Sequence, residues 1–178
     1  MRAPENHERA NLLLSRIAQG LLVFTLIAFA AKALIHTEVQ ARYSPLVIFH
    51  AATMIAWLTL LASQAWLAAQ HRLLLHRALG RASIALVGAM AASGAMIAVN
   101  IGQELGRPEV TVVNIAAFMT FTPLYLAALH FARRRNIHTH RQAMLIGTLA
   151  LMTPAYARLV QVLELPDPVA IGFRCRLR

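Results

Sequence analysis

Five long apolar stretches alternate with short polar segments along the chain. They cover residues 17–35, 45–69, 80–101, 110–133 and 142–164. Each one reaches the ~20 residues that a helix needs to cross a hydrocarbon core of about 30 Å. The pattern predicts an all-α fold: a polytopic transmembrane bundle of five helices that forms a single membrane domain over residues 1–178.

The four later stretches contain an internal repeat. When the chain is shifted by 64 positions, the "HR" at 76–77 falls on the "HR" at 140–141, and the flanking apolar runs coincide. Two consecutive helices with a short loop form an antiparallel pair. The repeat therefore predicts equivalent hairpins over 45–101 and 110–164, which together build a four-helix up-down core.

The composition excludes a water-exposed surface over most of the chain. Hydrophobic residues make up 58% and charged residues 13%, with a mean hydropathy of +0.57, whereas a soluble domain has about 25% charged residues. The net charge is +10, but its placement indicates a membrane surface and no nucleic-acid partner. With five crossings, ten basic residues lie on the side of the N-terminus: Arg2, Arg9, Arg16, Arg72, Arg77, Arg81, Arg133, Arg134, Arg135 and Arg141.

The opposite side receives six basic residues: Lys32, Arg42, Arg107, Arg174, Arg176 and Arg178. By the positive-inside rule, this asymmetry predicts a multi-pass protein of the inner cell membrane with a cytoplasmic N-terminus. Its basic loops are expected to face the anionic headgroups of the lipid bilayer.

The first apolar stretch is predicted to remain as a helix. The segment "AFAAKA" at 28–33 is similar to a signal-peptide cleavage site, but the polar leader before the stretch is 16 residues long and mixed in charge. The single cysteine of the chain, Cys175, allows no intrachain disulfide and no thiol cluster.

Acidic residues are nearly absent from the four later helices. The seven of the chain are Glu5, Glu8, Glu38, Glu104, Glu109, Glu164 and Asp167. Only Glu164 falls inside one of these helices, at its very edge. Paired-carboxylate catalysis and carboxylate proton relays are therefore poorly supported, and no catalytic residue is predicted.

Histidines gather on the side that receives the N-terminus. His76 and His140 open two helices at equivalent points of the repeat, and His130 closes another. A b-type haem requires two neutral imidazoles from different helices at one depth, with arginines close to its propionates. His76 and His140 are therefore the predicted metal ligands, with His130 as the alternative partner. Arg77 and Arg141 are expected to hold the propionates.

A second interpretation of the repeated His-Arg stays open. Arginine at the membrane interface binds lipid phosphate, and a histidine beside it caps a helix. In that case the pair marks only the boundary of the hydrocarbon core. A third pattern is weak: "HRLLLH" and "HTH" are similar to parts of the histidine boxes of membrane di-iron enzymes, but the chain lacks any HxxHH.

The second predicted helix carries a polar stripe that begins at His50. Trp57 and Gln64 follow at intervals of seven residues, so that the three share one face. An ionisable residue inside a membrane span is costly, which makes His50 a candidate functional residue. The alternative is a structural histidine bonded to a neighbouring backbone carbonyl.

Arg158 is the other costly residue. It lies about 24 Å beyond the inner start of the last helix, at a depth similar to that of His50, Asn100 and Asn114. An arginine without a carboxylate nearby favours an anionic or oxygen-bearing ligand, such as a quinone. His50 and Arg158 are therefore predicted to share an outer pocket, unless Arg158 snorkels to the headgroups.

Small residues recur every four positions over 82–98 in the third helix. Such spacing lets helix backbones approach closely in lipid, and we expect this face to pack against another helix. The alternative is that a flat prosthetic group lies against it.

The chain resembles a family of uncharacterised bacterial integral-membrane proteins. The similarity covers residues 49–159 and rests on "FHAATMIAWLTLLASQAWLAAQHRLLLHRALGRAS" and "HTHRQAMLIGTLALMTPAYARL". The residues that match the family pattern are His50, His76, Arg77, Leu79, Gly80, His140, Arg141, Met144 and Arg158. The layout is also similar to that of four-helix transmembrane b-type cytochromes. This chain has Asn114 where the repeat requires a second outer histidine, which disfavours a second haem.

Together these features lead to two functional hypotheses. The first is a membrane module that binds haem b and passes electrons to or from a quinone or a redox partner protein. The second is a non-enzymatic membrane subunit, lipid-binding protein or small transporter whose histidines are structural. A red or a colourless purified protein distinguishes the two.

Overall fold

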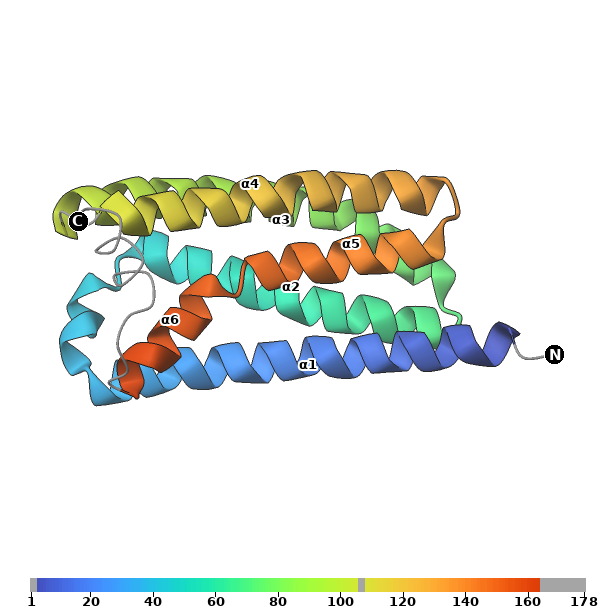
Figure 1. The fold of residues 1–178 in the computed structure, drawn as a ribbon, viewed down its shortest axis with the longest axis horizontal. Helices are drawn as coiled ribbons and strands as arrows, with labels where there is room; N and C mark the ends of the chain where they lie inside the picture. Colours follow the sequence, from blue (N-terminus) through green and yellow to red (C-terminus); the bar gives the residue numbers. More distant parts are fainter. Residues whose placement is uncertain (1–2, 106–107, 164–178) are drawn as a thin grey trace, which may run out of the picture. The chain divides into compact units, whose positions relative to one another are not determined.

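The computed structural model describes residues 3–105 and 108–163, and all regular structure in these residues is helical (Figure 1). The elements in chain order are α1 (Ala3–Ile35), the 3-10 helix η1 (Thr37–Arg42), α2 (Pro45–Ala69), α3 (Leu73–Leu105), α4 (Pro108–Arg133), α5 (Ile137–Ala150) and α6 (Thr153–Val162). The end of the fifth predicted stretch at Glu164 and the cysteine at Cys175 lie outside the described residues.

Four helices are long and apolar enough to cross a membrane. They are Arg9–Ile35, Pro45–Ala69, Leu73–Asn100 and Thr111–Arg133, and the bent pair of α5 and α6 provides a fifth if it forms one span. The prediction of a multi-pass, all-helical membrane protein is confirmed. Several helices extend beyond the apolar stretches that predicted them, because a helix continues into the headgroup region where polar residues are tolerated.

The fifth predicted stretch is divided, so that the five predicted transmembrane helices correspond to four unbroken candidate spans and one bent pair. α5 ends at Ala150, and α6 begins at Thr153 with a bend of 41° between them. Pro154 has no N–H to donate to the carbonyl of Ala150, and its ring crowds that carbonyl. The hydroxyl of Thr153 donates to the same carbonyl at 3.2 Å instead. The described residues therefore form six α-helices.

The chain divides into two compact units. The first contains Met1–Ile27 and Gln40–Ser93, and the second contains Ala28–Val39 and Gly94–Arg178. The first unit contains α2 with the part of α3 up to Ser93, and the second contains the rest of α3 together with α4 and α5. The single four-helix core that the repeat predicts stays a prediction, as does the repeat of the hairpins.

In the first unit, α1 packs against α2 through a polar contact. The hydroxyl of Ser15, which is 4% exposed, donates to the backbone carbonyl of Ala62 at 3.1 Å. α2 buries Trp57 and Leu58. Because hydrocarbon offers no hydrogen bonds, a buried hydroxyl paired with a carbonyl joins two membrane helices without leaving either group unpaired.

In the second unit, α4 and α5 run antiparallel and approach closely at Gly147 (Figure 1). A methyl group added to Gly147 would lie 3.3 Å from Cβ of Leu124, which is tighter than most such contacts. Phe121 and Tyr125 stack with ring centroids 5.8 Å apart on the buried side of α4. Glycine at this position therefore sets the spacing of the hairpin.

Candidate cofactor site

The turns of the two hairpins have the same backbone conformation. His71 and Arg135 are the C-terminal turn residues of α2 and α4, and both have a positive φ, 55° and 58°. In each turn the next N–H donates to the carbonyl five residues earlier: Arg72 to Leu67 at 2.9 Å, and Asn136 to Phe131 at 3.0 Å. This is the Schellman pattern of helix termination, in which glycine is the usual left-handed residue.

Two histidines cross these turns and bond to the preceding helix. Nδ1 of His76 lies 3.2 Å from the carbonyl oxygen of Gln64, and Nδ1 of His140 lies 2.9 Å from that of Ala128. A carbonyl oxygen only accepts, so Nδ1 carries the hydrogen in both rings. In the neutral imidazole, the lone pair is then on Nε2.

The two bonds connect the same points of each hairpin. Each histidine reaches back 12 residues, from the first turn of the later helix to the last part of the earlier one. Both side chains are half-buried. The bonds fix the orientation of each ring, and they also fasten each hairpin near its turn.

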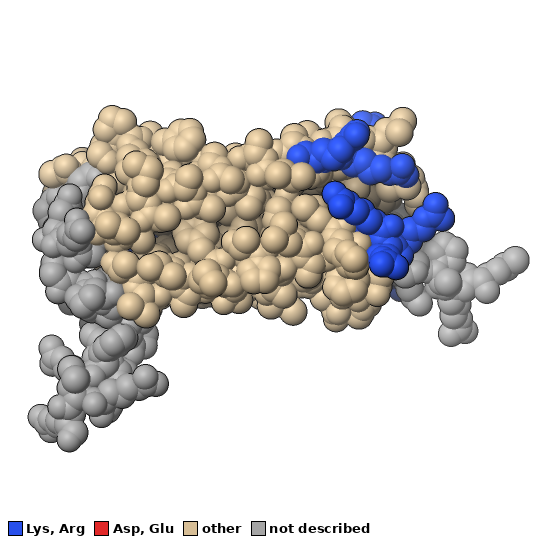
Figure 2. Space-filling view, turned by 90° about the horizontal axis from the view of Figure 1, so that it is seen from above, with Lys and Arg blue, Asp and Glu red and all other residues tan. Residues whose placement is uncertain are grey.

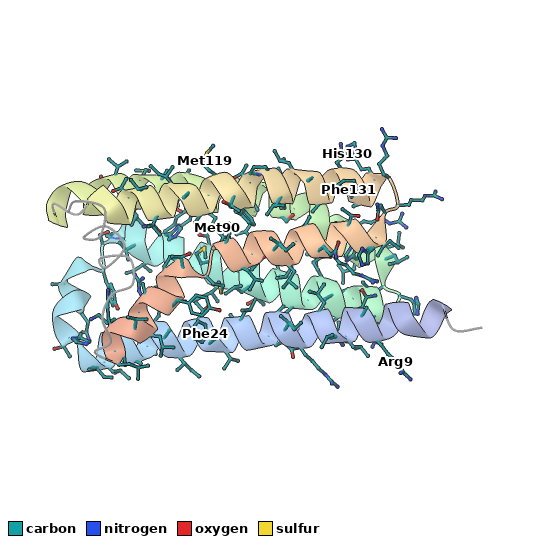
Figure 3. The ribbon with its side chains drawn as sticks, in the orientation of Figure 1. Arg9, Phe24, Met90, Met119, His130 and Phe131 are labelled. Atoms are coloured by element: carbon teal, nitrogen blue, oxygen red, sulfur yellow. The ribbon has the colours of Figure 1, made fainter. Side chains whose placement is uncertain are left out.

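The alternative ligand His130 is more exposed. His130 lies in the last turn of α4, exposed, with its ring edge-to-face against Phe131 at 5.7 Å (Figure 3). Ala128, two residues earlier, is 0% exposed, and two residues correspond to about 200° around a helix. His130 therefore faces away from the buried side of α4. Its role as an alternative ligand stays a prediction.

The arginines that follow the two histidines differ in exposure. Arg77 is exposed, whereas Arg141 is half-buried. The three arginines at the α4–α5 turn, Arg133, Arg134 and Arg135, are all exposed. Figure 2 shows basic side chains gathered at one end of the face drawn, and no acidic side chain among the described residues on that face.

His50 is held by a serine hydroxyl of α3. Its Nδ1 lies 3.0 Å from Oγ of Ser93, whose own hydrogen is donated to the carbonyl of Ala89 at 2.7 Å. Ser93 therefore accepts from His50, and Nδ1 of this ring also carries the hydrogen. The sequence identified His50 as costly, but it gave no sign that Ser93 was its partner in place of a backbone carbonyl.

Gln64 contributes a buried amide on the same stripe of α2. Its Nε2 and Oε1 are both shielded from solvent, and neither has a hydrogen-bond partner within the part of the chain that the structure describes. Trp57, two turns earlier, is 2% exposed. The stripe predicted from the seven-residue spacing is therefore mainly buried. It ends at Gln64, whose own backbone carbonyl His76 contacts.

Arg158 lies against an aromatic ring. Its Cζ is 4.1 Å from the ring centroid of Phe29, and its Nη1 donates to the carbonyl of Pro154 at 3.0 Å. The sequence predicted an anionic or oxygen-bearing ligand for Arg158 and gave no sign of the contact with Phe29. Arg158 belongs to the second unit and His50 to the first, so the pocket expected between them stays a prediction. So does the approach of His76 to His140.

No group of three or more histidine, cysteine, aspartate or glutamate residues lies close enough to hold a metal ion within residues 3–105 and 108–163. Haem differs from such a site, because its macrocycle supplies four nitrogen atoms and the protein adds at most two ligands.

Compared with protein-family models, with curated proteins and with solved structures, the chain matches none of them. The resemblance to a bacterial membrane family therefore rests on the quoted residues alone. The structure establishes a multi-pass helical membrane protein.

Proposed function

We propose that the protein is a membrane module that binds one b-type haem and transfers electrons, and that Nε2 of His76 and Nε2 of His140 would hold its iron. The observation that carries this proposal is the pair of Nδ1 bonds to the carbonyls of Gln64 and Ala128. Metal-binding histidines almost always donate their other ring N–H to a carbonyl or carboxylate, which fixes the tautomer and the ring orientation. Bound haem supplies a one-electron redox centre to the membrane.

The agreement between the two turns supports a duplicated hairpin. The positive φ angles, the Schellman bonds and the histidine bonds all occur at residues 64 positions apart. Duplicated hairpins in the same orientation place His76 and His140 at equal depth, which two ligands of one macrocycle require. Such a duplication also puts both turns on the side of the N-terminus, which we assign to the cytoplasm.

The arginines that follow the two histidines support a haem whose propionates would lie near the hairpin turns. Arg77 and Arg141 follow the two histidines, and guanidinium groups bind carboxylates in a bidentate manner. His50 pairs with Ser93, whereas its repeat equivalent is Asn114. The far end therefore offers one imidazole, which together with Arg158 is proposed to bind a quinone or contact a redox partner.

The same contacts favour one other function. A histidine that bonds the preceding helix fastens the hairpin, whether or not it binds a metal. On this alternative, the protein is a non-enzymatic membrane subunit, lipid-binding protein or small transporter, and His76 and His140 are structural.

Asparagine substitutions separate the two functions. Nδ2 of asparagine is the same number of bonds from Cα as Nδ1 of histidine, so His76→Asn and His140→Asn keep a donor for the carbonyl but remove the coordinating nitrogen. His138→Asn, at an exposed position of α5, is the matched control. We expect the wild type and the control to show a Soret band that shifts on reduction, and both test variants to lose it, while all four haem-free proteins share one thermal midpoint.

Two results would contradict haem binding. One is a wild-type protein that remains colourless after incubation with haemin. The other is full haem retention in either asparagine variant. If no variant binds haem while His76→Ala and His140→Ala lower the thermal midpoint and the asparagine variants do not, the hairpin-fastening function is supported.

A further inference from the structure

The unpaired amide of Gln64 indicates a missing polar group. An amide removed from water without a hydrogen-bond partner is costly, and native proteins rarely leave such groups unpaired. Both polar atoms of Gln64 are in this state within the described chain. The backbone carbonyl of Gln64 contacts His76, the proposed haem-binding histidine. The unpaired amide therefore lies on a residue that is already in contact with the proposed site.

Gly80 leaves an open space on the same side of α3 as His76. The positions 76, 80, 83 and 87 recur at intervals of three and four residues, and Ser83 and Val87 on this stripe are buried. Gly80 is half-buried, yet a methyl group built on it would meet no described atom of another helix within 4 Å.

The two hairpins use glycine in opposite ways. At Gly147 an added methyl group would press against Leu124 at 3.3 Å, so that the glycine there serves helix packing. At Gly80 nothing described occupies the space that a side chain would fill. Since close helix approach does not explain Gly80, its lack of a side chain leaves room for a group outside the described chain.

We propose that Gly80 and Gln64 form, with His76, the binding face for a planar macrocycle with acidic substituents. A ring held at His76 and extending along α3 passes Gly80, which is one turn or about 6 Å further along the helix. Without a side chain at this position, the flat face of the ring contacts the helix backbone. Nε2 of Gln64 donates to a carboxylate substituent, in a charge-assisted hydrogen bond.

This inference rests on the proposed haem function, and it assigns two residues that haem ligation alone does not require. The probe is haemin, titrated into the purified full-length protein in detergent and followed by Soret absorbance. The test variants are Gly80→Leu, which fills the space, and Gln64→Met, which keeps the length of the side chain but removes its polar atoms. The matched controls are Gly88→Leu, at an exposed glycine of the same helix that also has open space around it, and Gln19→Met, at an exposed glutamine of α1.

We expect Gly80→Leu to weaken haemin binding by at least tenfold and Gln64→Met to weaken it by about tenfold, while both controls bind as the wild type does. The haem-free protein provides a second readout. There, Gln64→Met should keep or raise the thermal midpoint, because it removes an amide that has no partner until haem is bound.

The possible failures can be told apart. A wild type that binds no haemin, or that binds it independently of His76, overturns the haem function and this inference together. If binding depends on His76 but Gly80→Leu and Gln64→Met bind as tightly as the controls, only this inference is overturned. A lower thermal midpoint of haem-free Gln64→Met also overturns it, since Gln64 would then have a structural partner.

Discussion

The contact between Arg158 and Phe29 permits a quantitative test of how the charge is stabilised. Cζ of the guanidinium lies 4.1 Å from the ring centroid, well within the ~6 Å range of a cation–π interaction. Such pairs contribute about 0.5–1 kcal/mol when exposed and ~2 kcal/mol or more when desolvated. Both side chains are half-buried, so we expect a coupling free energy of about 1–2 kcal/mol.

A double-mutant cycle measures this coupling. Phe29→Leu removes the aromatic face but keeps an apolar side chain, and Arg158→Met removes the charge but keeps the length. Each single variant also loses other contacts, such as the hydrogen bond from Arg158 to Pro154, and the cycle cancels these contributions. The free energy of unfolding of the four proteins is measured by denaturant titration in detergent micelles.

Additive effects of the two substitutions would contradict a cation–π interaction between Arg158 and Phe29. If the double variant differs from the sum of the single variants by less than about 0.3 kcal/mol, the ring contributes no specific interaction. Arg158 would then be stabilised by its contact with the Pro154 carbonyl and by headgroups, as a snorkelling arginine is.

Three further substitutions test the turns and the helix contacts. His71→Gly should raise the free energy of unfolding by about 0.5–1 kcal/mol. The residue has φ of 55°, a left-handed conformation that costs a non-glycine residue about 1–2 kcal/mol, and the greater flexibility of glycine in the unfolded chain offsets part of this gain. A loss of stability in thermal unfolding would contradict this prediction. Gly147→Leu should lower the free energy of unfolding by about 1–3 kcal/mol, because the larger side chain overpacks against Leu124. An unchanged unfolding midpoint would show that α4 and α5 can move apart at no cost. Ser93→Ala should lower the free energy of unfolding by about 1 kcal/mol, since His50 loses its acceptor. An unchanged value would mean that this hydrogen bond has no net effect.

The membrane-spanning helices were largely predictable from the sequence, because an apolar run of ~20 residues has few alternatives. The stretch 45–69 coincides with α2 at both ends. The break before Thr153 was not predicted, although Pro154 was visible in the sequence. Membrane helices tolerate proline when another group satisfies the freed carbonyl, and only the structure shows that Thr153 donates to it.

The candidate site was predictable as a set of residues and not as a set of contacts. The repeated His-Arg identified His76 and His140, but both bond to backbone carbonyls, which carry no sequence signature. Arg135 has positive φ where glycine is usual, so composition gave no indication of the turn. The open space at Gly80 depends on which neighbouring side chains fill the region around it. The spacing of residues along one helix does not predict this.

The histidine bonds have a consequence for the order in which the protein is assembled during synthesis. Each bond joins residues only 12 positions apart in the chain, and contacts of short sequence separation form early because little chain entropy is lost in closing them. The α2–α3 hairpin can therefore close as soon as its second helix has emerged from the ribosome, before α4 emerges. Each hairpin then enters the bilayer as a preassembled pair whose turn is already fastened.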